Sequence, residues 1–107
     1  DEWSRTCSWN ARTSLEMIDS VKLNRPAVVL FRFHLGVDAE IVQRSASSVR
    51  VSMEPDQLEL TGSVPIEARL VPWPGPDERV GDHLCLIVST DAEADRFDLT
   101  TTITDKA

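Results

Sequence analysis

The chain has 107 residues, a length that fits one small domain and excludes two independent cores. Its net charge is −7 and its basic residues do not cluster, which excludes nucleic acid and anionic membranes as partners and disfavours strong polyanion binding. No segment approaches the ~20 apolar residues of a membrane span, so we expect a soluble protein, with the periplasm or secretion as candidate locations. Because the chain opens at Asp1 without a methionine, we interpret residues 1–107 as one domain from a longer or processed chain.

Short segments of alternating polarity recur along the chain, each bounded by Pro, Gly, Asn, Asp or Ser. They predict strands at 15–21, 27–35, 39–44, 48–53, 57–61, 66–71, 83–89 and 97–104. Turns are predicted at 22–26, 45–47, 54–56 and 91–95, and the first turn should join its two flanking strands as an antiparallel pair. Residues 72–77 contain three prolines, which predicts a surface loop without regular structure. The sequence therefore predicts an all-β antiparallel sandwich of eight or nine strands.

The segment 27–35 is the clearest strand, because alternate residues separate onto two faces. Val29, Phe31, Phe33 and Leu35 share a dry face, and Leu30, Arg32 and His34 share a mixed face. The predicted core collects the apolar positions of this strand and their counterparts elsewhere. It comprises Val29, Phe31, Phe33, Leu35, Val49, Val51, Leu58, Leu60, Leu84, Leu86, Phe97 and Leu99.

The residues that carry chemistry are few. Cys7 and Cys85 lack a nearby cysteine partner, so we expect unpaired thiols that are at least half buried, with one long-range disulfide as the alternative. His34 and His83 are expected to form ordinary structural hydrogen bonds. The phosphate-loop, serine-hydrolase and zinc-protease motifs are absent, so no catalytic residue, metal site or cofactor is predicted.

Three tryptophans could stack on sugar rings, since the indole offers the largest aromatic face. Trp3 and Trp9 are six residues apart and would share a face of one continuous strand, which favours core packing. Trp73 lies between two prolines and is the better candidate for a sugar contact, together with Arg69 and Arg79. The alternative is that the loop around Trp73 folds back to cap the edge of the sandwich.

Four segments, 3–5, 15–21, 32–35 and 97–101, together resemble the downstream β-domain of heparinase II/III-like polysaccharide lyases. In that family a strand ending in an Ile-Asp-Ser-Val type segment, here 18–21, precedes an Arg-Phe-His-Leu strand, here 32–35. The resemblance implies an antiparallel β-sandwich joined to a helical toroid, with elimination next to a uronic acid in the cleft between them. The toroid is absent from this sequence, and no position matches the family's catalytic tyrosine, asparagine or histidine. His34 matches a family position that looks structural or, in some members, contributes to a metal site.

These observations predict a non-catalytic domain that supports an upstream catalytic region of the same chain and lines its glycan cleft. Two alternatives remain. One is a free-standing carbohydrate-binding module that uses Trp73, Arg69 and Arg79 to hold a polysaccharide or oligosaccharide. The other is an immunoglobulin-like domain that binds protein through its edge strands or loops.

Overall fold

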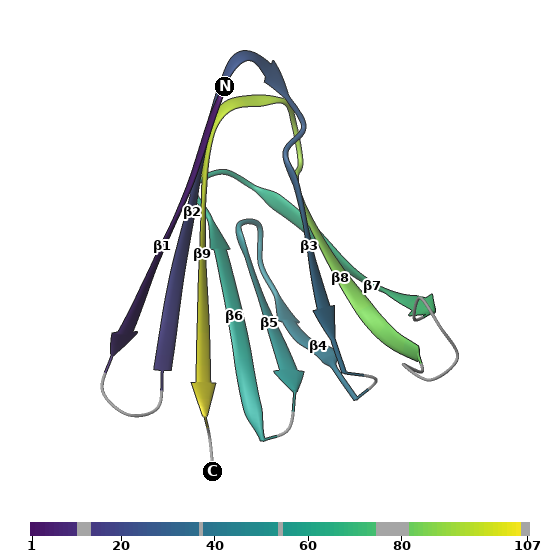
Figure 1. The fold of residues 1–107 in the computed structure, drawn as a ribbon. Coiled ribbons are helices and arrows are strands. Elements are labelled where there is room, and N and C mark those ends of the chain that lie inside the picture. The colour runs from purple at the N-terminus through teal and green to yellow at the C-terminus, as the bar shows by residue number, and fades with distance from the viewer. Residues whose placement is uncertain (11–13, 37, 54, 75–81, 106–107) are drawn as a thin grey trace.

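Two antiparallel sheets make up the fold (Figure 1). The structure is a computed structural model, and it describes residues 1–10, 14–36, 38–53, 55–74 and 82–105. Its strands are β1 (Glu2–Asn10), β2 (Ser14–Ala27), β3 (Leu30–Leu35), β4 (Glu40–Arg44), β5 (Ser48–Met53), β6 (Asp56–Gly62), β7 (Ile66–Pro74), β8 (Asp82–Thr90) and β9 (Ala94–Asp105). The larger sheet has the order β1-β2-β9-β6-β5-β4, and the smaller has the order β3-β8-β7. The predicted all-β antiparallel sandwich is confirmed. Within the described ranges no helix is long and apolar enough to cross a membrane.

The predicted antiparallel pairing of 15–21 with 27–35 is wrong. β2 pairs with β1 on one side and β9 on the other, while β3 pairs with β8 in the smaller sheet. The predicted turn at 22–26 lies inside β2, where the register with β9 shifts between Lys22 and Ala27. Because a strand has only two edges, β1 and β9 leave none for β3. The residues read as a turn instead lead the chain across to the other sheet.

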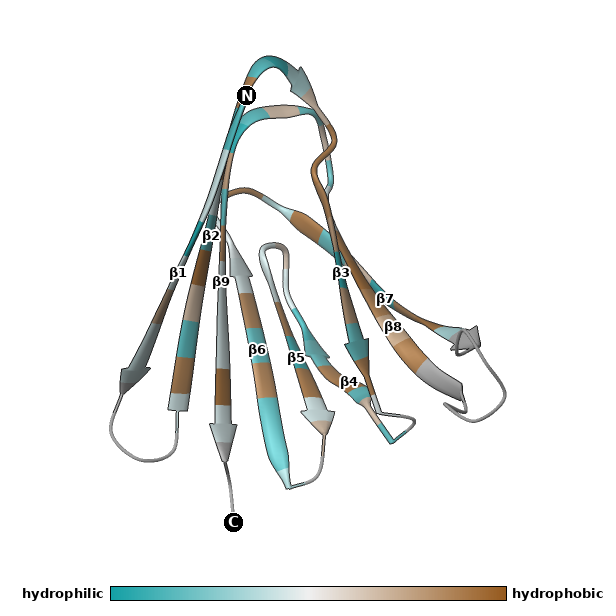
Figure 2. Cartoon of the chain, viewed as in Figure 1, coloured by the Kyte–Doolittle hydropathy of each residue, from teal (hydrophilic) through white to brown (hydrophobic). Residues whose placement is uncertain are grey.

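The core lies where the smaller sheet covers the larger one. It consists of Ala39, Val49, Val51, Leu58, Leu60, Ile66, Leu86, Val88, Phe97 and Leu99. The Phe31 and Phe97 rings join the two sheets, with centroids 6.2 Å apart. Of the predicted core, Val29, Phe31, Phe33, Leu35 and Leu84 are partly buried and pack against this cluster. Figure 2 shows β8 hydrophobic along most of its length, and its Leu86 and Val88 are completely buried in the core.

The chain passes from β6 to the smaller sheet beside Gly62, where the sheets approach closely. A Cβ atom at position 62 would lie 2.6 Å from Ile66 Cγ2 and 2.9 Å from the Val64 carbonyl oxygen. Glycine is therefore required here for its lack of a side chain.

Six strands face three, so one side of the larger sheet has an uncovered inner face. Arg44 of β4 donates a hydrogen bond to the Ala68 carbonyl of β7, which links the sheets on the opposite side. The sheets diverge around the β1–β2 hairpin (Figure 1). Trp3 and Trp9 share the inner face of β1, as the six-residue spacing predicts, but the core packing predicted for them is wrong. They are 61% and 77% exposed, because no strand of the smaller sheet lies opposite.

The cysteine predictions divide in the same way. Both thiols are free, as expected, and Cys85 is buried. Cys7 is exposed, contrary to the prediction, because it lies on the uncovered part of β1.

The predicted break at 72–77 is wrong for its first three residues, because β7 continues to Pro74. β7 is an edge strand, and an edge tolerates proline where the missing N–H would point to solvent. Residues 75–77 lie outside the described ranges.

Phe97→Ala is expected to lower the free energy of unfolding by about 3–5 kcal/mol, the usual loss for a fully buried aromatic side chain. Phe33→Ala should cost less, because Phe33 is only partly buried. Urea denaturation of both variants tests this order. A larger loss for Phe33→Ala would mean that the smaller sheet, rather than β9, centres the core.

Thr101→Val is expected to raise the free energy of unfolding by about 1 kcal/mol. The Thr101 hydroxyl is buried on β9 without a hydrogen-bond partner among the described residues, and such groups cost about 1–3 kcal/mol. Thr100→Val, on the opposite face of the same strand, is the control and should change stability by less than about 0.5 kcal/mol. Destabilisation by Thr101→Val would show that the hydroxyl has a partner.

Candidate functional site

One surface that carries exposed arginines, including the predicted glycan contact Arg69, is the outer face of the smaller sheet. We call it the three-strand face. It consists of Leu30, Arg32 and His34 of β3, Cys85, Ile87 and Ser89 of β8, and Glu67, Arg69 and Val71 of β7.

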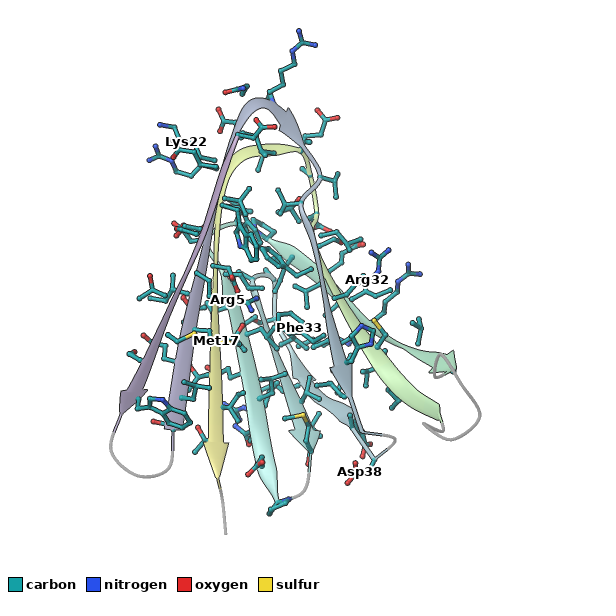
Figure 3. All side chains as sticks on the ribbon, viewed as in Figure 1. Arg5, Met17, Lys22, Arg32, Phe33 and Asp38 are labelled. Atoms are coloured by element: carbon teal, nitrogen blue, oxygen red, sulfur yellow. The ribbon has the colours of Figure 1, made fainter. Side chains whose placement is uncertain are left out.

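Arg32 and Arg69 lie on either side of Ile87 in one row across the three strands. Two strand spacings separate their backbones by about 10 Å. Both arginines are exposed, whereas Ile87 between them is only 9% exposed. Figure 3 shows Arg32 pointing away from the larger sheet while its neighbour Phe33 points toward it. Neither guanidinium forms an ion pair with a described residue, so both are available to a ligand.

A hollow of about 560 Å³ lies beside Arg69. Leu30, Glu67 and Ser89 from the three-strand face contribute to its wall, and Arg44 and Ser48 contribute from β4 and β5. The hollow therefore extends the three-strand face around the edge of β7. Its volume lies within the usual ligand-site range of about 300–1,000 Å³.

The next row of this face places His34 opposite Cys85 and Cys85 opposite Val71. Trp73 follows two residues after Val71 and is opposite His83 in the register, so it occupies the same set of alternate positions on β7 as Arg69 and Val71. The Trp73 and His83 side chains and all of Arg79 lie outside what the structure describes. Of the predicted glycan-contacting residues, the described part of the chain thus places Arg69 and the backbone of Trp73 on one strand.

A second polar cluster lies on the inner face of β1 and β2. Asp19 is completely buried, and its carboxylate accepts a hydrogen bond from Arg5 Nε at 2.7 Å and another from Arg5 Nη2 at 3.3 Å. Trp3 Nε1 donates a third hydrogen bond to this carboxylate at 3.2 Å. The Arg5 guanidinium carbon also lies 5.5 Å from the centroid of the Trp3 ring. The buried charge is therefore fully paired.

Asp19 raises the pKa of the Arg5 guanidinium, first through the hydrogen bond and then through its charge, although partial desolvation opposes the shift. Arg5 therefore remains charged at every ordinary pH. The cluster holds its two charges in one hydrogen-bonded ion pair. Its chemistry is that of a structural ion pair at the border of the core.

Among the described residues, no group of three or more His, Cys, Asp or Glu side chains is placed to hold a metal ion. His34 and Cys85 are neighbours in register, but Val71 completes their row. No family model and no curated protein matches the chain.

Two features of these sites were not predicted from the sequence. Arg32 was placed on the mixed face of its strand, yet its partnership with Arg69 depends on β8 lying between β3 and β7. The Arg5–Asp19 pair likewise depends on the register of β1 with β2. The one available signal was the even spacing of Trp3 and Arg5, which places both on one face of a strand.

Arg5→Met is expected to lower the free energy of unfolding by about 2–4 kcal/mol, because it leaves the buried Asp19 carboxylate without its cation. The figure is below the usual range for a fully buried pair because Arg5 is 40% exposed. Adding Asp19→Leu should recover most of this loss, since an apolar pair needs no compensating charge. Chemical denaturation of the two single variants and the double variant measures the coupling. Purely additive losses would contradict the assignment.

Proposed function

We propose that this chain is a non-catalytic β-sandwich domain that contacts an acidic polysaccharide through its three-strand face. The observation that carries the proposal is the pair of unpaired, exposed arginines, Arg32 and Arg69, on either side of Ile87. A guanidinium binds a carboxylate or sulfate with two parallel hydrogen bonds, and the sheet fixes the two arginines in a defined relation. The Ile87 side chain between the two arginines would lie under the C–H face of a sugar.

The net charge of −7 does not oppose this interaction at close range. At physiological ionic strength exposed charges are screened beyond about 8 Å. A ligand on the three-strand face therefore responds mainly to Arg32, Arg69 and Glu67. The distant acidic groups slow its approach more than they weaken the bound state.

Within this proposal, the domain supports the catalytic region of a heparinase II/III-like polysaccharide lyase and lines its glycan cleft. The resemblance of 15–21 and 32–35 to that family supports this role, and Arg32 belongs to the second of these segments. A substrate cleaved next to a uronic acid carries carboxylates, which is the chemistry that Arg32 and Arg69 select.

A free-standing carbohydrate-binding module is the second candidate, and the hollow beside Arg69 favours it. A module must hold its ligand without help from another domain, and a concave site buries more of an oligosaccharide than a flat sheet does. The two candidates differ in how tightly the isolated chain binds. A module binds saturably alone, whereas a supporting domain contributes a weak surface contact.

Replacing both arginines, Arg32→Ala with Arg69→Ala, is expected to weaken binding of acidic oligosaccharides by about 100-fold. Each charge-assisted contact contributes about 1.5–3 kcal/mol, which is roughly tenfold or more in Kd. NMR titration with heparin-like, alginate-like and neutral oligosaccharides measures this, with chemical shifts of Ile87 and of the Trp73 indole N–H as reporters. Acidic sugars should shift these signals and neutral sugars should not.

The matched control removes two cations from the outer face of the larger sheet, Lys22→Ala with Arg96→Ala. These residues line a separate hollow of about 530 Å³ and are exposed, so the control changes net charge by the same amount. It should leave binding nearly unchanged. If both double variants lost binding affinity equally, the effect would be explained by net charge alone. The absence of any chemical shift change with acidic sugars would contradict a glycan-binding role for the isolated chain.

A further inference from the structure

β1 is a sheet edge that lacks the usual protection against pairing with another strand. It spans nine residues, contains no proline or lysine, and pairs with β2 without a register shift. No described strand pairs with its other side, because β1 ends the larger sheet. Its cation Arg5 is turned onto Asp19 and does not guard the edge. An edge of this kind presents an unpaired row of backbone donors and acceptors.

The remaining edge strands differ from β1. β4 has only five residues and a register irregularity between Ile41 and Gln43. β7 contains Pro72 and Pro74, and β3 has only six residues. Short strands, bulges and prolines are the devices that prevent edge pairing. The contrast singles out β1 among the described edges.

The sequence of β1 is nearly symmetric about its centre, Thr6. Reading outward from Thr6, Ser4 matches Ser8 and Trp3 matches Trp9, while the innermost pair, Arg5 and Cys7, and the outermost pair, Glu2 and Asn10, differ. In an antiparallel pair of identical strands related by a two-fold axis, residue i is opposite a residue equidistant from the centre. The symmetry of β1 is the pattern that such a pair requires.

We propose that β1 pairs antiparallel with β1 of a second copy of this chain, with the two-fold axis at Thr6. Each Trp3 is then opposite Trp9 of the other copy, and Thr6 is opposite its own counterpart. Arg5 is opposite Cys7 and Glu2 is opposite Asn10, so no two like charges meet across the pair. The two larger sheets join into one continuous sheet.

The exposure of the two tryptophans supports a second copy of this chain, rather than an unrelated protein, as the partner of β1. Trp3 and Trp9 are 61% and 77% exposed on the same face of β1, where the smaller sheet does not reach. Pairing in this register places four indoles in two cross-strand pairs, an arrangement that stabilises antiparallel sheets. Pairing with a strand of different sequence would not explain why Trp3 and Trp9 lie at equal distances from Thr6.

Introducing a charge at Thr6 tests the proposal, because the two-fold axis brings position 6 of one copy opposite position 6 of the other. Thr6 is exposed on the face opposite the tryptophans, so the substitution does not disturb them. Thr6→Lys places two lysines directly opposite each other, and Thr6→Glu places two glutamates opposite each other. Each variant alone should raise the dimer Kd by about tenfold or more relative to the unmodified chain. An equimolar mixture of the two variants should restore dimers, because lysine then faces glutamate. Sedimentation equilibrium at about 0.15 M salt measures all three samples.

Thr61→Lys is the matched control, since Thr61 is exposed on the same face but lies on β6, away from any edge. It should dimerise like the unmodified chain. A chain that stays monomeric at millimolar concentration overturns the proposal, as does a dimer that Thr6→Lys leaves intact. Dimers restored by Thr6→Lys mixed with Thr6→Glu, but not by either alone, establish the axis.

Discussion

The packing of three strands against six governs the remaining features of this molecule. Apolar side chains such as Leu60 and Phe97 are completely buried only where the smaller sheet lies above them. Beyond that boundary the inner face of β1 continues the same sheet but meets solvent, with Trp3 and Trp9 exposed. The boundary therefore fixes where the core ends, where Asp19 needs a cation, and which tryptophans remain exposed. It also leaves β1 as an open edge.

The strands and their faces were predictable because side-chain direction alternates along any strand. Val49 and Val51 were assigned to the core from period alone, and both are almost completely buried. Phe31 and Arg32 were assigned to opposite faces of one strand, and the structure confirms this division. A period of two depends only on neighbouring residues, so it needs no knowledge of which strands pair.

Partnership between strands was not predictable in the same way. The segment 22–26 has the composition of a hairpin turn, yet β9 inserts next to β2 from the far end of the chain. The site on the three-strand face has the same origin, because Arg32 and Arg69 meet only through the pairing of β3 and β7 with β8. Burial of Trp3 and Trp9 was overestimated because spacing reports a shared face and not what covers it.

The Arg5–Asp19 ion pair has a consequence for how the β1–β2 hairpin selects its alignment. A slip of one residue would turn every side chain to the wrong face, but a slip of two residues preserves both faces. Hydrophobic alternation cannot distinguish the native alignment from this second one. A two-residue slip would place Asp19 opposite Trp3 or Cys7 in place of Arg5, leaving a buried carboxylate without its cation. The ion pair thus acts as an alignment key that polarity patterning cannot supply.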